Sequence, residues 1–244
     1  INNLAGGIGN QMFQYAMGKS FGLKNNIPIL YSDTFNQYSY TFPKIQDIFD
    51  LNIEYAADIQ MTSMYSLMRY SFIRRLSGKL CNVVGKQLFP GCIFDLHSGY
   101  SPIELMEDRQ AYYLHGYWQS ENYFTDFKAQ ILEDFTFRKT RSLSEIDSSF
   151  EDVEVKVGVH IRRGDYVSNS KAASKLNSQP LKYYTDYMSM YRRKFPNCIF
   201  YVFSDDIQWA RNELSLLFEG TRFCEGEKMN AASDLQMLSQ CDHF

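Results

Sequence analysis

The sequence predicts an α/β protein built from two Rossmann-like units. Two observations support this class: strands and helices alternate through the second half, and a strand–loop–helix–strand pattern opens the first half. A charged, Ser-rich segment at 138–154 reads as the linker, and 244 residues suffice for two domains. Such sheets bind ligands at the carboxyl ends of their strands, so we expect a ligand cleft between the two units.

The second half has the clearest periodicity. A β-branched run, typical of a strand buried on both faces, begins it and apolar residues at helical spacing follow. The predicted elements are a strand at 155–161, a helix at 181–195, a strand at 198–203, a helix at 207–218, a short strand at 221–224 and a helix at 231–241.

The first half has fewer clear elements. Apolar spacing predicts a helix over 11–23 with Asn10 as its N-cap, and buried strands are predicted at 27–31 and 112–118. The strand that should precede the first helix is expected to be cut away. The segment 61–80 is an amphipathic helix with a basic side. We favour a core-facing role for it, because Met stripes usually pack inward, and keep peripheral membrane contact as the alternative.

Composition narrows the functional classes. With 45% hydrophobic and 22% charged residues the chain is globular, and a net charge of -3 argues against a nucleic-acid partner. No apolar run is long enough to span a membrane. The 5 cysteines form no C-x-x-C pair, which argues against a zinc or redox motif and fits a reducing compartment, so we expect a cytoplasmic protein.

The strongest chemical signal is the segment 157–166, VGVHIRRGDY. A hydrophobic strand runs directly into two arginines, and guanidinium groups match the oxygens of a diphosphate. Because side chains alternate along a strand, His160 and Arg162 share one face while Arg163 begins the turn. Gly164 permits that turn and Asp165 is placed to hold an arginine. The alternative is a structural ion pair at a strand end.

A glycine segment near the start, Gly6-Gly7-Ile8-Gly9, resembles a phosphate or dinucleotide loop, but it lacks the third glycine and the Gly-Lys-Ser/Thr ending. Its amides, at Gly7 above all, suit an anion or a sugar. An ordinary strand-to-helix turn is the alternative.

Acidic residues follow the later strands and helices. Asp205 and Asp206 end the strand at 198–203; we expect one to contact a ligand and the other to cap the next helix. Asp234 is placed to accept hydrogen bonds from a base edge, or is simply a first-turn acid. Neither a D-x-D sequence nor a His or Cys cluster is present, so no metal site is predicted.

An aromatic and polar cluster lies at 115–121. His115, Tyr117, Trp118 and Glu121 suit a sugar platform, although a strand packed in a core would show the same Tyr and Trp.

Together these segments resemble a known family, the bacterial α-1,2-fucosyltransferases of glycosyltransferase family 11. The segments that carry the resemblance are 4–18 (LAGGIGNQMFQYAMG), 115–124 (HGYWQSENYF), 157–166 (VGVHIRRGDY), 200–206 (FYVFSDD) and 234–243 (DLQMLSQCDH). The resemblance implies a GT-B-like fold, with an acceptor-side domain at 1–150 and a GDP-fucose-binding domain at 151–244. It also implies that the donor domain is truncated here, because the family continues into a Ser-rich, tryptophan-containing segment.

The resemblance further implies roles for individual residues. Arg162 would grip the β-phosphate with support from Arg163 and Asp165, while His160 and Asp234 contact the guanine or ribose. Asp205 would lie near the nucleotide, and Asn10 and Gln11 would face the reacting sugar. The candidates for a general base are Asp33, His115 and Glu121.

The implied activity is inverting transfer of L-fucose from GDP-L-fucose to the 2-hydroxyl of a terminal galactoside, with no metal and no separate cofactor. The alternatives are a fucosyltransferase of other linkage (α-1,6 or protein O-linked) and a non-catalytic glycan-binding module. A dinucleotide oxidoreductase is disfavoured by the missing third glycine and the twin arginines.

Overall fold

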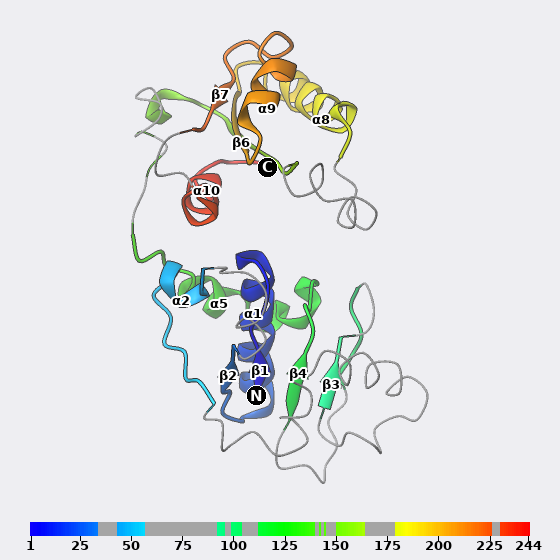
Figure 1. The fold of residues 1–244 in the computed structure, drawn as a ribbon, viewed down its shortest axis with the longest axis vertical. Helices are drawn as coiled ribbons and strands as arrows, with labels where there is room; N and C mark the ends of the chain where they lie inside the picture. Colours follow the sequence, from blue (N-terminus) through cyan, green and yellow to red (C-terminus); the bar gives the residue numbers. More distant parts are fainter. Residues whose placement is uncertain are drawn as a thin grey trace. The chain divides into compact units, whose positions relative to one another are not determined.

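The computed structural model describes residues 1–33, 43–56, 92–95, 99–103, 112–139, 142, 144, 150–163, 179–225 and 230–244. Within it the chain divides into two compact units, Ile1–Arg138 and Lys139–Phe244 (Figure 1). The division falls at the start of the charged segment 138–154. The amphipathic segment 61–80 lies outside the described residues, as do Gly164 and Asp165.

The first unit contains a four-stranded parallel sheet in the order β2-β1-β4-β3. Its strands are short: β1 is Asn2–Asn3, β2 is Tyr31–Ser32, β3 is Cys92–Phe94 and β4 is Tyr113–His115. The expectation that the opening strand is missing was wrong, because Asn2–Asn3 pairs with both β2 and β4. All the strands are parallel, so the loops that follow them meet at one edge of the sheet.

Helix α1, Ile8–Asn25, packs against this sheet and begins earlier than predicted. Its N-cap is Gly7, and Asn10 lies inside its first turn, so the assignment of Asn10 as the cap was wrong. The reason is Gly6, whose φ of 83° turns the chain sharply out of β1 and lets the helix start at once. Met17 and Phe21 of α1 pack against Leu114 and Trp118 in the core of the unit.

Shorter helices complete the first unit. They are α2 (Ile45–Ile48), η4 (Glu121–Tyr123), η5 (Thr125–Phe127) and α5 (Lys128–Asp134).

The second unit is a parallel sheet in the order β5-β6-β7. The strands are β5 (Lys156–Ile161), β6 (Ile199–Ser204) and β7 (Arg222–Phe223), and the helices are η7 (Phe150–Asp152), α8 (Leu181–Lys194), α9 (Ile207–Leu214) and α10 (Ala231–Leu238). Each strand and helix predicted for this half is present, with ends moved by a few residues. The two parallel sheets confirm the α/β class.

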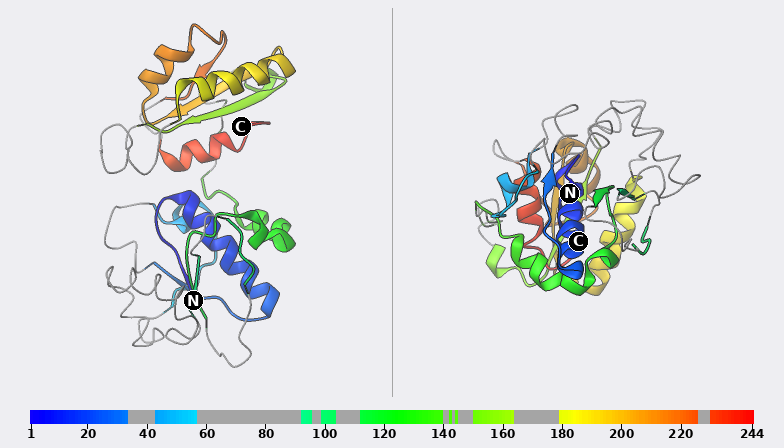
Figure 2. Two further views of the ribbon diagram at one scale, coloured as in Figure 1. Left: turned by 90° about the vertical axis from the view of Figure 1, so that its right-hand side faces the viewer. Right: turned by 90° about the horizontal axis from the view of Figure 1, so that it is seen from below.

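Helices cover both faces of the second sheet (Figure 2). On one face Val157, Ile161, Phe200 and Val202 pack with residues of α8 and α9. On the other face Tyr201 and Phe203 pack with Met237 of α10. These residues alternate along the strands, so the continuous apolar runs reflect burial on both sides.

The chain after α10 returns to the free edge of β5. His243 forms a parallel bridge with Val157, and the Gly158 N–H donates to the His243 carbonyl at 2.8 Å. The path therefore runs outward from β5 through β6 to β7, and then back to the opposite side of β5. This reversal makes β5 a topological switch point, where ligands bind beyond the carboxyl ends of the strands.

Candidate functional site

The carboxyl edge of β5 and β6 brings together two segments that are far apart in the sequence. In the strand register His160 lies opposite Phe203, and Ile161 lies opposite Ser204. The residues that follow, Arg162 and Arg163 after β5 and Asp205 and Asp206 after β6, therefore lie side by side. As the sequence predicts, the two arginines follow directly after β5 and the two acids directly after β6.

Arg163 is held in place from several directions. Its backbone N–H donates to Asp205 Oδ1 at 2.7 Å, and its Nε lies 3.5 Å from Asp206 Oδ2. Its guanidinium carbon lies 3.8 Å from the centre of the Trp209 ring, which is a cation–π stack. Arg163 is thus a fixed positive charge that is already engaged inside the unit.

The two acids have separate structural roles. Asp206 is the N-cap of α9 and accepts a hydrogen bond from the Trp209 N–H at 3.3 Å, which confirms that one of the pair caps this helix. Asp205 accepts the bond from the Arg163 backbone, so its visible role is to hold the turn after β5.

Arg162 differs from its neighbour because its side chain is exposed. It follows β5 on the face that carries His160. Desolvation is the largest cause of the lowered pKa of that histidine; the Asp205 carboxylate opposes it, and the Arg162 charge is a smaller cause in the same direction as desolvation. His160 is therefore neutral at pH 7 and has one ring nitrogen to donate and one to accept.

Asp234 lies in the first turn of α10, the helix on the same sheet face as His160. The cap of this helix is Asn230, whose side chain accepts from the N–H groups of Ala232 and Ser233 at 3.0 and 3.1 Å. Asp234 is therefore not needed as a cap. Within the described residues its Oδ1 is buried without a hydrogen-bond partner, and desolvation raises the pKa of its carboxyl group to about 6. An unpaired carboxylate oxygen suits a ligand N–H or O–H group.

The carboxyl edge of the first sheet is built from amides and glycines instead. Gln11 is buried and donates to the carbonyls of Gly6 and Pro43 at 2.9 and 3.0 Å, while its Oε1 accepts from the Ile45 N–H at 3.0 Å. It therefore lies beneath the glycine loop and ties it to α2. Gly7 and Gly9 are different, because a Cβ added to either would have no contact within 4 Å in the part of the chain that the structure describes, their own local backbone aside.

The other candidates of the first unit lie along the same edge. Asn10 Oδ1 accepts from Gln119 Nε2 at 2.8 Å. Asp33 pairs with the Lys44 ammonium group at 2.7 Å, which already uses its charge. His115 ends β4, is half-buried and stacks on Tyr113 with ring centres 6.2 Å apart.

Glu121, the third candidate for a general base, lies on η4 with an exposed carboxylate 3.8 Å from the Lys128 ammonium group. The geometry thus leaves all three candidates in place and assigns the role to none.

Comparison with known proteins decides the family. The model of the family described as "Glycosyl transferase family 11" matches residues 94–244, more than half of the chain. The chain belongs to glycosyl transferase family 11. The resemblance seen in the sequence is confirmed, and the protein is a glycosyltransferase.

Two relatives of this glycosyltransferase are informative. It is 29% identical to the alpha-1,2-colitosyltransferase of Escherichia coli over all of this chain and 81% of that protein. It is 28% identical to the galactoside 2-alpha-L-fucosyltransferase SEC1 of Bos taurus over 53% of this chain and 37% of the bovine protein. The crystal structure of the fucosyltransferase NodZ from Bradyrhizobium superimposes with a TM-score of 0.49 and 15% identity, covering 98% of this chain and 85% of that one.

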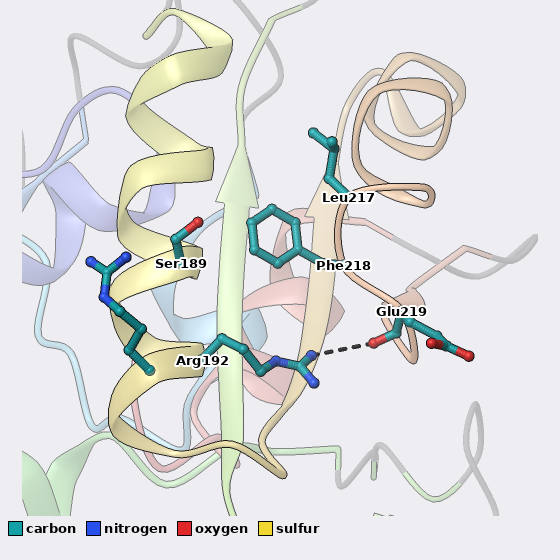
Figure 3. A pocket seen from close by; sticks show the side chains of 6 residues that line it. Ser189, Arg192, Leu217, Phe218 and Glu219 are labelled. Carbon is teal, nitrogen blue, oxygen red and sulfur yellow. Dashed lines mark hydrogen bonds between the residues drawn. The ribbon is translucent and has the colours of Figure 1, made fainter.

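A shallow pocket of the glycosyltransferase lies elsewhere on the second unit (Figure 3). Its volume is about 340 Å³, and it lies between the last turns of α8 and the segment Leu217–Glu219, where Arg192 donates to the Glu219 carbonyl at 3.2 Å. Because α8 runs back from the carboxyl edge of the sheet, its last turns lie at the amino ends of the strands. This pocket therefore lies at the opposite edge of the sheet from Arg162 and Arg163.

Among the described residues there is no group of three or more His, Cys, Asp or Glu side chains placed to hold a metal ion. No helix in the described parts of the chain is long and apolar enough to cross a membrane.

Sequence reasoning missed several residues that shape these edges. The apolar spacing predicts only that Trp209 lies in a helix, whereas in the structure its ring stacks on the Arg163 guanidinium group. Nothing in the sequence marks Gln14 or Gln119, although Gln14 donates to the Gly116 carbonyl and Gln119 donates to Asn10. Their roles depend on partners distant in sequence, for which a single sequence offers no signal.

Proposed function

We propose that this glycosyltransferase transfers L-fucose from GDP-L-fucose to the 2-hydroxyl of a terminal galactoside, with inversion at the fucose carbon and without a metal ion. One observation carries the proposal: Arg162 and Arg163 lie at the carboxyl end of β5, at the switch point of a parallel sheet. The family assignment and the two relatives support the reaction class.

The carboxyl edge of the second sheet, which carries Arg162 and Arg163 and is called the arginine edge below, suits a departing diphosphate. Negative charge builds on the leaving group as the bond to the sugar breaks, and a guanidinium group remains positive at any working pH. Arg162 is the exposed member of the pair and is assigned to the β-phosphate. Arg163 is held by Asp206 and Trp209 and contributes a positive charge that does not have to move during the reaction.

The face of the second sheet that carries His160 and α10 suits the nucleoside part of the donor. His160 is neutral at pH 7, and Asp234 has a carboxylate oxygen without a partner among the described residues. Both groups hydrogen-bond readily to the edge of a base or to ribose hydroxyls. We assign them to the guanosine part of the donor.

The proposed transfer forms one bond and breaks one. The oxygen of the acceptor 2-hydroxyl forms a bond to the anomeric carbon of fucose, and the bond from that carbon to the β-phosphate oxygen breaks. GDP leaves with the electron pair, and the hydroxyl proton passes to a base on the acceptor side. Attack from the face opposite the diphosphate inverts the configuration.

A second donor deserves a test because of one observation. The relative aligned over the whole chain is a colitosyltransferase, and colitose differs from L-fucose by the loss of one hydroxyl group. The alternative function is therefore α-1,2 transfer of colitose from GDP-colitose through the same arginine edge.

The deciding experiment is calorimetry of the full-length protein with GDP, with and without a chelator. We expect binding that the chelator does not change. Transfer from GDP-L-fucose and from GDP-colitose to a galactoside is then compared, and the linkage of the product is determined. Absence of GDP binding, or affinity for free glycan with no response to GDP, would overturn the proposal in favour of a glycan-binding module. A linkage other than α-1,2 would overturn the regiochemistry alone.

A further inference from the structure

The loops at the carboxyl edge of the first sheet are tied together by one buried amide. Gln14 in α1 is buried; its Oε1 accepts from the Ala5 N–H at 2.7 Å, and its Nε2 donates to the Gly116 carbonyl at 2.9 Å. Ala5 follows β1 and Gly116 follows β4, so a single side chain sets the distance between the two loops.

The loop after β4 is held on its other side by Asp95. The Asp95 N–H donates to the His115 carbonyl at 3.0 Å, and Asp95 Oδ2 accepts from the Trp118 N–H at 2.8 Å. Trp118 is buried and has a φ of 54°, which a bulky residue adopts only when its surroundings impose it. Gly116 admits no side chain, since an added Cβ would lie 2.1 Å from the Cβ of Asp95.

The loop after β4, residues 116–119, exposes the aromatic ring of Tyr117 to solvent. Tyr117 is 52% exposed and has no hydrogen bond or ring contact within the described residues, although neighbouring rings are paired. Tyr100, which is 48% exposed, stacks edge-on against Tyr123, and the Trp118 ring packs against Tyr123 as well. Tyr117 is thus presented outward by a loop whose geometry is fixed from below.

Polar groups and open space adjoin this ring. A Cβ added to Gly6 would lie 3.7 Å from a ring carbon of Tyr117, so the ring stands next to the glycine loop. Asn10 in the first turn of α1 and Gln119 after β4 form an exposed amide pair, which leaves the Asn10 NH₂ and the Gln119 carbonyl for other partners. Among the described residues, no atom would contact a Cβ added to Gly7 or Gly9.

We propose that Tyr117, Asn10 and Gln119 form the subsite that binds the terminal sugar of the acceptor. An aromatic face packs against the apolar C–H face of a pyranose, and neutral amides hydrogen-bond to its hydroxyls without charge. Galactose presents such a C–H face together with hydroxyls on the ring edge. This assignment rests on the proposed function and identifies the residues of its acceptor side.

The test measures acceptor binding directly in the full-length protein, by ligand-observed NMR titration with a β-galactoside-terminated oligosaccharide. Tyr117→Ala is expected to weaken binding about tenfold, and Tyr117→Phe is expected to stay within about twofold because the ring remains. Gln119→Ala is expected to weaken binding about threefold. All three substitutions are at the surface, so the fold should be retained. Tyr187→Ala on α8, where the side chain is 51% exposed, is the matched control and is expected to change nothing.

The outcomes separate this subsite from the proposed function. If Tyr117→Ala binds the oligosaccharide as the parent does while GDP binding is intact, the subsite is wrong and the transfer reaction stands. If the parent binds the oligosaccharide through Tyr117 but does not bind GDP, the subsite stands and the proposed reaction fails. If the parent does not bind the oligosaccharide at any concentration tested, with or without GDP, the subsite is overturned.

Discussion

The two sheets of this glycosyltransferase present edges of the same geometry and opposite chemistry. In the second unit the carboxyl edge carries ionic side chains, with Arg162 and Arg163 beside Asp205 and Asp206. In the first unit the corresponding edge carries the Asp33–Lys44 ion pair, but most of its side chains are neutral. The neutral residues are amides, glycines and one exposed tyrosine, namely Asn10, Gln11, Gln14, Gln119, Gly6, Gly7 and Tyr117.

The difference matches two kinds of ligand. A diphosphate carries charge that grows in the transition state, and fixed positive groups stabilise it strongly where water is excluded. A sugar hydroxyl is neutral, and a charged partner would have to give up its hydration without gaining an ionic interaction. One edge therefore suits the leaving group and the other suits the acceptor.

The largest expected effect is a loss of turnover when Arg162 is removed from the carboxyl edge of the second sheet. Arg162→Ala is expected to lower kcat about 10²- to 10³-fold, because it removes the exposed charge assigned to the departing phosphate. Arg162→Lys should fall between, since an ammonium group keeps the charge but cannot bind bidentately. Turnover with GDP-L-fucose measures the effect, and circular dichroism checks the fold. Arg193→Ala, an exposed arginine on α8, is the control; near-normal turnover in a folded Arg162→Ala protein would refute the role of this residue.

At the carboxyl edge of the first sheet, added side-chain volume should lower the free energy of unfolding. Gly116→Ala is expected to lower the free energy of unfolding of the first unit by about 1–3 kcal/mol or more, because the new Cβ collides with Asp95. Gly9→Ala is the matched control and should instead raise the free energy of unfolding by up to about 1 kcal/mol. Gly9 lies in α1, and an added Cβ would meet no atom of the other described residues within 4 Å. Thermal unfolding measures both, and equal effects from the two substitutions would show that the loop after β4 is not rigid.

A smaller effect, on stability, separates the two roles of Asp206, which caps α9 and lies beside the Arg163 guanidinium group. Asp206→Ala removes the N-cap of α9 and should cost about 1 kcal/mol of stability, whereas Asp206→Asn keeps a capping oxygen and should cost little. Denaturant unfolding of the two variants provides the measurement. If both lose the same amount, the contact with Arg163 contributes more than the cap.

The smallest effect concerns Asp234 and depends on pH. Desolvation raises the pKa of this carboxyl to about 6 in the folded protein from an ordinary value of 3.8, so the folded state binds a proton that the unfolded state has released between these values. Stability therefore falls as pH rises from 4 to 6, and the loss persists above pH 6. Asp234→Asn should raise stability at pH 8 by about 1 kcal/mol, a figure reduced for partial solvent exposure, and should have no such effect near pH 4. Melting temperatures across this range test the prediction; a parallel shift at every pH would contradict it.

Sequence reasoning succeeded where periodicity and burial coincide. The β-branched run of β5 and the apolar spacing of α8 predicted both elements to within a residue, because strands and helices buried in a layered sheet must repeat their apolar residues. It failed at the start of α1. The glycines looked like a loop of several residues, but Gly6 alone makes the turn and Gly7 already caps the helix.

The sequence by itself determined the class of the fold and the positive charge at the end of β5, because periodicity follows from burial and because arginine side chains keep their charge wherever they lie. Strand alternation placed Arg162 on the face of His160 and Arg163 at the start of the turn, but it did not identify the partners that hold Arg163. Only the tertiary structure decided that Arg163 stacks on Trp209 and pairs with Asp206 while the Arg162 side chain is exposed, since these partners come from a different strand and helix. In the same way the structure alone showed that Gln14 joins Ala5 to Gly116, the residue before Tyr117, because contacts between distant segments arise from packing and leave no local pattern.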